Sequence, residues 1–258
     1  MDTTDIALLL GAGLAAGTVN AIAGGGSLIT FPALVATGLS PVSANVTNSV
    51  AVFPGYAASV VGSRADLAEL AVNRRRLLVS LTPTAVLGTA LGCALLLATP
   101  ERAFELVVPF LVLTAAGVLA FQDRLRRVVG HPHDMTPRRR ALSLHAMVGL
   151  GCVYGGYFGA ALGVMLVAAL GLVLHETLAR ISALKNAVSA LEGLVTVLAF
   201  AAFGPVNWAD VAVLAPATVT GGYLGARAAR RMPARVLRPV IVGFGVLVGL
   251  ILLWRALR

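Results

Sequence analysis

Hydrophobic residues along this chain fall into eight long blocks, with the polar residues gathered between them. The blocks cover roughly residues 6–37, 42–63, 77–98, 103–121, 141–174, 177–203, 208–226 and 236–254. A helix needs about 20 apolar residues to cross a bilayer, so every block is long enough, and the first and fifth are too long for one crossing. The pattern predicts an all-α polytopic membrane protein.

Composition strengthens this prediction. Hydrophobic residues make up 58% of the 258 positions and charged residues 12%, whereas a soluble domain carries about 25% charged residues. The first ten residues contain no Lys or Arg, so we expect no cleaved signal peptide. The net charge of +9 comes from Arg beside the apolar blocks, a placement that indicates cytoplasmic loops and contact with the lipid bilayer rather than nucleic acid.

The two halves of the chain share a pattern of Gly and Pro. Gly26 matches Gly159, and Pro83 matches Pro216. Because Gly and Pro determine backbone geometry, these matches predict a duplicated fold, each copy with about four hydrophobic segments. We expect a first transmembrane repeat at 1–122, a basic cytoplasmic linker at 123–140 and a second repeat at 141–258.

Arg placement predicts how each repeat faces. The connections after the second, fourth and seventh blocks are rich in Arg, whereas the connection at 204–208 and the N-terminus have none. Two blocks lie between the N-terminus and the connection after the second block, and two lie between the connection after the fourth block and the one at 204–208. The positive-inside rule puts the two ends of each interval on opposite sides of the membrane, so each interval must cross it an odd number of times. The overlong first block of each repeat must therefore be re-entrant or cross twice. We expect inverted repeats, with the N- and C-termini outside the cytoplasm, although Arg255 and Arg258 run against that placement.

The first block is interrupted by glycine. Gly24, Gly25 and Gly26 follow one another, and glycine weakens a helix interior. A helix that restarts near Ser27 would present free N–H groups and a positive dipole end, which suit an anion. Asn20 lies just before the break. Close helix packing by small residues is the alternative interpretation.

Polar side chains inside the other blocks extend this candidate site. Gly159 and Tyr154 belong to a second glycine-rich segment, and Asn48 lies on a helical face of the second block. In the sixth block, Lys185, Asn186 and Glu192 lie along one helical face. Ionisable groups inside a membrane are candidates for function.

We expect Lys185 to bind an anion, and Glu192 to bind an ammonium group or carry a coupling proton. A structural Lys–Glu pair stays open as the alternative.

Two segments resemble a known family. NAIAGGGSLITFPALVATGLSPVSANVTNSV (20–50) is similar to the first signature of the TauE/SafE membrane permeases, and GGYFGAALGVMLVAALGL (155–172) to the second. The resemblance implies an inner-membrane permease for sulfite, sulfonates or related anions. Carried over by position, it points to Asn20, the run from Gly24 to Ser27, Asn48, Gly159, Lys185 and Asn186.

The sequence therefore predicts a secondary transporter for a small anion, working by alternating access. A passive anion channel is the alternative, and an intramembrane enzyme is a third class for which we find no catalytic motif. We expect no metal and no cofactor. A homo-oligomer stays open.

Overall fold

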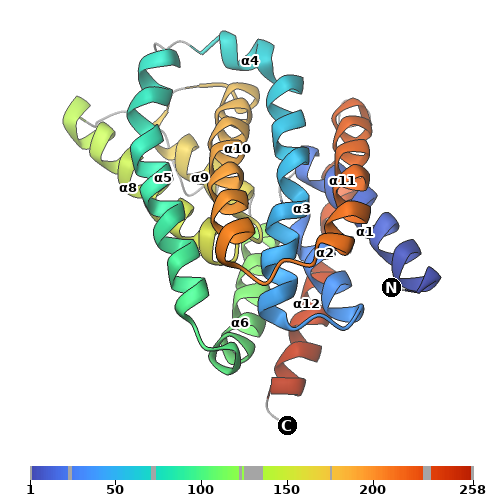
Figure 1. Cartoon of the computed structure of the whole chain (residues 1–258). Helices are drawn as coiled ribbons and strands as arrows, with labels where there is room; N and C mark the ends of the chain where they lie inside the picture. The colour runs from blue at the N-terminus through green and yellow to red at the C-terminus, as the bar shows by residue number, and fades with distance from the viewer. Residues whose placement is uncertain are drawn as a thin grey trace.

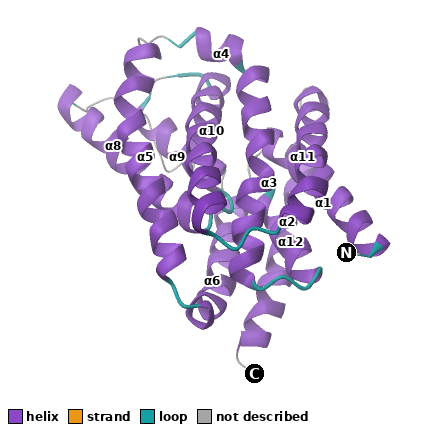
Figure 2. Ribbon diagram, viewed as in Figure 1, coloured by secondary structure: helices purple, strands orange, loops and turns teal. Residues whose placement is uncertain are grey.

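The computed structural model describes residues 2–22, 25–70, 74–121, 124, 136–174, 176–228 and 234–256, which form helices and loops without a strand (Figure 2). The all-α prediction is confirmed for these ranges. The helices are α1 (Thr3–Ile22), α2 (Ser27–Ala36), α3 (Pro41–Gly62), α4 (Arg64–Ala68), α5 (Arg74–Ala98), α6 (Glu101–Ala120), α8 (Pro137–Tyr157), α9 (Leu162–Val173), α10 (Leu178–Phe203), α11 (Trp208–Ala228) and α12 (Ala234–Ala256). Most of the linker predicted at 123–140 lies outside the described residues.

Local sequence sets several helix starts. Ser40 caps α3 by accepting a hydrogen bond from the Ser43 amide at 3.4 Å, and Pro41 follows at the first helical position. Thr177 caps α10 in the same way through the Arg180 amide. A hydroxyl at the cap satisfies one of the amides that a helix start leaves unpaired, and proline there has no N–H to lose.

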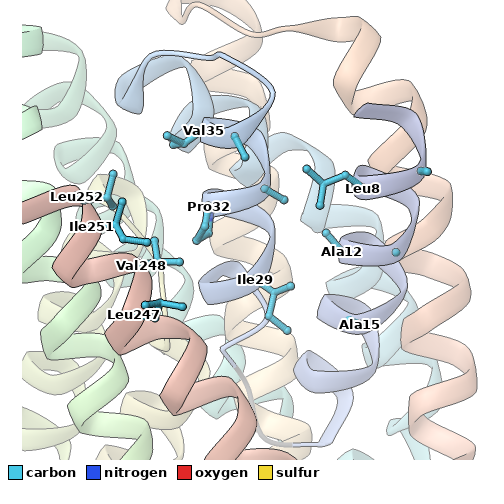
Figure 3. A pocket seen from close by; sticks show the side chains of 14 residues that line it. Leu8, Ala12, Ala15, Ile29, Pro32, Val35, Leu247, Val248, Ile251 and Leu252 are labelled. Atoms are coloured by element: carbon cyan, nitrogen blue, oxygen red, sulfur yellow. The ribbon is translucent and has the colours of Figure 1, made fainter. Parts of the chain in front are cut away.

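Each overlong block folds into two antiparallel helices. In Figure 3, α1 runs from Leu8 towards Ala15 while α2 runs the opposite way from Ile29 to Val35. In the second hairpin, α8 and α9 lie side by side with α9 contacting the glycine-rich end of α8. The short arms, α2 and α9, have 10 and 12 residues. At 1.5 Å per residue they measure roughly 15–18 Å, about half of the hydrocarbon core.

Six helices stand in a row, which Figure 1 shows from left to right as α8, α5, α10, α3, α11 and α1. α6 packs along α12, which also contacts α2. The long arm of each hairpin therefore packs on a helix from the other half of the chain, α1 on α11 and α8 on α5. The two halves are interleaved rather than side by side.

Glycine allows the two cross-half contacts. A Cβ atom on Gly17 would lie 2.2 Å from the Thr218 carbonyl oxygen, and one on Gly92 would lie 2.1 Å from the Val153 carbonyl oxygen. Both distances are far inside van der Waals contact. The backbones of α1 and α11, and of α5 and α8, thus approach so closely that no side chain fits between them, as in small-residue helix packing in membranes.

Large apolar side chains cover much of the outside. Leu87, Leu150 and Phe203 are 71%, 72% and 80% exposed. Three helices, Arg75–Ala98, Glu101–Ala120 and Ala179–Phe203, are long and apolar enough to cross a membrane, as judged on the described residues. An exposed apolar surface of this extent is stable in lipid rather than in water.

Candidate functional site

The first break is held by Asn20. Its side-chain oxygen accepts hydrogen bonds from the backbone amides of Gly25 at 3.1 Å and Gly26 at 2.7 Å. Gly25 has a φ of +117°, which favours glycine. Two amides that the sequence predicted to be free for an anion are thus bound to Asn20, and Gly24 lies outside the described residues.

The second break is held by Tyr154. Its hydroxyl donates to the Ala160 carbonyl at 2.7 Å. Gly159 has a φ of +74° and Ala161 a φ of +59°. A left-handed residue other than glycine is uncommon, and the tie from Tyr154 to the adjacent carbonyl stabilises the turn in which it lies.

The two breaks meet in the interior. Phe31 of α2 packs edge-on against Phe158 of the second break, with ring centroids 5.4 Å apart. Both rings are buried. The contact joins segments that lie far apart in the chain, and it places Ser27, at the start of α2, across a small pocket from Gly159.

That central pocket is lined by residues from four helices, including Ser27 where α2 begins, and from the second break. They are Ser27, Ser49, Val52, Tyr56, Gly155, Phe158, Gly159, Glu192, Gly193 and Thr196. Its volume is about 10 Å³, enough for about one water molecule. The pocket combines hydroxyl groups with one carboxyl group, and in this conformation it is too small for a sulfite ion.

Glu192 is the ionisable acid of this pocket. Its side chain is buried, and glycine at position 155 leaves room for it, because a Cβ there would lie 3.0 Å from Glu192 Oε1. Among the residues that the structure describes, the ion pairs join Arg180 to Glu69 and Glu176 and do not involve Glu192. A buried carboxyl group without a cationic partner is costly in its charged form, which is typical of a group that exchanges a proton.

Lys185 and Asn186 lie two turns away from this pocket, towards the start of α10. Lys185 is buried but does not line the pocket. The Asn186 amide donates to Ser63 Oγ at 3.1 Å and reaches the Ser59 carbonyl at 3.5 Å, so it ties α10 to the end of α3. The predicted site residues thus form two groups, one at the breaks and one nearer the α4 end of the molecule.

A family comparison now decides the class of the protein. The model of the family "Sulfite exporter TauE/SafE" matches residues 9–252. This chain belongs to the TauE/SafE family. The glycine breaks at the centre of the fold are the segments that resembled the family in sequence.

Relatives of this TauE/SafE protein are described as transporters. A "Probable membrane transporter protein" of Haemophilus influenzae is 29% identical over 239 residues, covering 92% of this chain and 90% of the relative. "Probable membrane transporter protein YfcA" of Escherichia coli K12 is 30% identical over 239 residues, covering 88% and 81%. No solved structure matches the chain. Together with the apolar helices, these findings identify a multi-pass membrane transporter and not an enzyme.

Asn48 of this TauE/SafE transporter is bonded within the fold. Its side-chain oxygen accepts a hydrogen bond from the Thr30 hydroxyl, which joins α3 to α2. Nearby, the Asn45 amide donates to the Tyr157 carbonyl at 2.9 Å, which joins α3 to the end of α8. Asn48 was predicted to be a substrate-binding residue; in the structure its oxygen is engaged with α2, and Asn48 does not line the pocket.

Sequence reasoning left three pocket hydroxyls out of the candidate site. Ser49 and Tyr56 project from α3, and Thr196 projects from α10 one turn after Glu192. Ser49 and Tyr56 are seven residues apart, and Glu192 and Thr196 are four apart, so each pair shares a helical face that the sequence shows. Hydroxyl groups are common in membrane helices, however. Only the segments that face these hydroxyls across the pocket set them apart from hydroxyls outside the site.

A larger pocket lies beside the start of α3. It has a volume of about 300 Å³ and is lined by Ser40, Val42, Leu96, Leu97, Thr99, Glu101, Phe203 and Pro205. These residues come from the α2–α3, α5–α6 and α10–α11 connections and the helix ends beside them. This pocket, called the vestibule below, lies at the Arg-poor end of the fold.

Proposed function

We propose that this transporter moves a small anion by alternating access, with sulfite, sulfonates and related sulfur-containing anions as its substrates. The observation that carries the proposal is the small, polar central pocket near which the two glycine breaks meet. Ser27, Ser49 and Thr196 supply hydroxyl groups to this pocket. The hydroxyls of Ser49 and Thr196 donate to the carbonyls of Asn45 and Gly193 in this conformation, so they would turn from these acceptors to donate to the oxygens of a bound anion. The start of α2 adds a positive dipole end to the same pocket.

The route that we infer follows the interface between α3 and α10. Val42 faces the vestibule, Ser49 and Tyr56 face the central pocket, and Ser59 and Ser63 meet Asn186 at the far end. The first four lie along α3, and Ser63 directly follows its last residue. A substrate would therefore pass from the Arg-poor side to the Arg-rich side along this face of α3, which is polar from Ser49 onward, or in the reverse direction.

Two hydrogen-bonded contacts close this route. Asn45 ties α3 to the carbonyl of Tyr157 between the vestibule and the pocket. Asn186 ties α10 to Ser63 on the other side. We propose that these contacts open in turn, one on each side. The remaining predicted site residues act next to these contacts. Gly159 lines the pocket, whereas the others hold the breaks and α2 in place: Asn20, Gly24, Gly25, Gly26, Asn48 and Tyr154.

Lys185 and Glu192 have separate roles in this proposal. Lys185 neutralises the anion on the Arg-rich side of the pocket, two helical turns from Glu192. Glu192 carries a coupling proton, because a carboxylate beside an anionic substrate is repelled unless it is protonated. One proton would then accompany each anion through the pocket.

Inverted duplication of the two halves is part of the proposal. It is supported by similar contacts in the two halves: a Cβ on Gly221 of α11 would meet the Leu14 carbonyl of α1, and one on Gly88 of α5 would meet the Gly149 carbonyl of α8. α3 and α10 pack against each other. We infer repeats at 1–122 and 141–258, re-entrant hairpins that enter from opposite sides, and a cytoplasmic linker at 123–140. The lack of Arg near the N-terminus supports its place outside the cytoplasm. We infer the same side for the C-terminus from the number of crossings, against the positive charge of Arg255, and we infer a place in the inner membrane.

Flux measurements on purified protein in liposomes test this function. We expect saturable uptake of labelled sulfite or a sulfonate, and faster uptake when the opposite side holds unlabelled substrate. Lys185→Ala should lower the rate at least about tenfold, in line with the loss of a buried charged contact of about 1.5–3 kcal/mol. Leu150→Ala, on the outer surface of α8, is the matched control.

The same experiment separates a carrier from a channel. Exchange stimulated by substrate on the opposite side requires a pocket that faces one side at a time. Conductance that does not saturate, without stimulated exchange, would instead establish a passive anion channel and refute alternating access. Absence of any anion flux would refute the substrate class.

A further inference from the structure

A large apolar groove lies on the outside of the first hairpin, away from the central pocket. Its volume is about 720 Å³, and α1, α2 and α12 form its walls. Figure 3 shows Leu8, Ala12, Ile29, Pro32, Leu247 and Ile251 around it. All fourteen lining residues are apolar or glycine. Such a space does not hold water, and leaving it empty would forfeit the packing contacts of its walls.

The dimensions of the groove match half of a bilayer. On α1 the wall runs from Ala7 to Ala15, about 12 Å at 1.5 Å per residue. Half of the hydrocarbon core is about 15 Å thick. The groove also ends beside Ala36, at the end of the short helix α2, so it spans the depth of one leaflet.

The end of the groove next to Val35 leads to a charged group. A second pocket of about 330 Å³ shares Val35 and Leu252 with the groove and is lined by Glu105 near the start of α6. Glu105 is exposed. An apolar groove that ends near a carboxylate is complementary to a lipid whose acyl chain lies in the groove and whose head group carries a terminal ammonium.

We propose that this groove binds one phospholipid with an ammonium head group, as in phosphatidylethanolamine. One acyl chain lies between α1, α2 and α12, and the ammonium group pairs with Glu105. The lipid is a specific ligand of the first hairpin rather than a part of the general lipid annulus.

Such a lipid would stabilise α2 on the side opposite to the central pocket. The α2 helix separates the two spaces: Ile29 and Pro32 face the groove, whereas Ser27 lines the central pocket. A filled groove holds α2 against α3, where Thr30 donates to Asn48. Loss of the lipid would loosen α2 and the break that precedes it.

Native mass spectrometry of the full-length protein, released from detergent after incubation with defined lipids, tests the proposal. The key variant is Gly11→Phe. Gly11 lines the groove, and no atom lies within 4 Å of a Cβ placed there, so the ring fills the groove without a backbone clash. Gly117→Phe is the matched control, because Gly117 also has open space around its Cβ position but lies on α6 outside the groove.

We expect the wild type and Gly117→Phe to retain one phosphatidylethanolamine, and Gly11→Phe to lose it. Glu105→Gln should retain a bound lipid but lose its preference for phosphatidylethanolamine over phosphatidylglycerol. The expected decrease in that preference is roughly fivefold, the value of one charge contact near a membrane surface. Because Glu105 is exposed, this variant is expected to fold even where Gly11→Phe does not.

Three results would overturn the proposal. One is equal lipid retention by Gly11→Phe and wild type. Another is an unchanged head-group preference in Glu105→Gln. The third is a protein that is dimeric as wild type and monomeric as Gly11→Phe, which would assign the groove to a second copy of this chain. None of these readouts depends on transport activity, so failure of the lipid proposal would leave the proposed transport function untouched, and the flux experiments test that function independently.

Discussion

Glu192 and the hydroxyl groups around it are the chemical centre of the molecule at the scale of single residues. The carboxyl group shares its pocket with Ser27 from the first break and Gly159 from the second. Asn20 and Tyr154 do not line this pocket; they hold the breaks in shape. The residues that build the site and the residues that face its interior are therefore largely different sets.

Proton coupling through Glu192 gives a direct prediction. Glu192→Gln keeps the size of the side chain but cannot release a proton, so uptake driven by a pH gradient should be lost while exchange of substrate at equal pH continues. Proteoliposomes with an imposed pH difference measure both. Glu69→Gln, an exposed carboxylate with 68% side-chain exposure, is the control. Gradient-driven accumulation by Glu192→Gln would exclude this role.

Asn20 should matter for stability as well as for transport. Asn20→Ala leaves the buried amides of Gly25 and Gly26 without an acceptor, which costs about 1–3 kcal/mol for each unsatisfied group. We expect a lower melting temperature in detergent. Asn20→Asp retains the accepting oxygen and should lie closer to wild type. Equal melting temperatures for Asn20→Ala and wild type would show that water replaces the side chain.

Sequence reasoning found part of this site. The run of glycines predicted a break and its position, because three glycines destabilise a helix whatever surrounds them. It could not predict that Asn20 takes up the freed amides, since hydrogen-bond partners depend on how the chain returns on itself. It also placed Lys185 and the breaks in one site, whereas the structure separates Lys185 from the pocket by two helical turns.

At the scale of helices, the hairpins are the distinctive elements. Each has a long arm that packs on the other half of the chain and a short arm that covers about half of the membrane. The long arms are bound by backbone contact at Gly17 and Gly92. The first hairpin reaches the central pocket through Ser27 of its short arm, whereas the second reaches it through Gly155 of its long arm and through its break.

The contact at Gly92 predicts a large effect of one methyl group. Gly92→Ala would place a Cβ 2.1 Å from the Val153 carbonyl oxygen, so α5 and α8 must separate. We expect a loss of about 1–3 kcal/mol or more, seen as a lower melting temperature and reduced yield. Gly243→Ala, where no atom lies within 4 Å, should be neutral or slightly stabilising by helix propensity. Equal behaviour of both variants would contradict the close approach.

The sequence predicted the existence of the helices better than their partners. Each apolar block became a helix or a helix pair, because hydrophobic length alone requires it. The short helix α4 lies in a polar connection, which has no apolar block from which a helix could be predicted. The pairing of α1 with α11 was not predicted, since it joins residues at opposite ends of the chain that share no local signal.

At the scale of the whole molecule, the two halves depend on each other. α1 belongs to the first half but packs on α11, and α8 belongs to the second half but packs on α5. A motion in which one half rocks as a unit would break both contacts. Movement of α3 and α10 against each other, along which the proposed route runs, would leave both intact.

This interleaving predicts the behaviour of a split protein. Residues 1–122 and 141–258, expressed separately, should each be degraded, because each lacks the partner of its long hairpin arm. Expressed together, they should copurify and restore sulfite uptake in liposomes. Stable accumulation of 1–122 alone, as a monomer, would show that the half folds without α11 and would remove the basis of the prediction.

The two hairpins differ in when their partner helices are synthesised. The partner of α8 has already been made when α8 appears, whereas α1 ends at Ile22 and its partner α11 begins only at Trp208. At about 5–20 residues per second, this interval lasts roughly 10–40 s. During that time the glycine face of α1 is without its partner in the membrane. The second hairpin is therefore expected to assemble first during biosynthesis, and the first hairpin closes the fold only when the chain is almost complete.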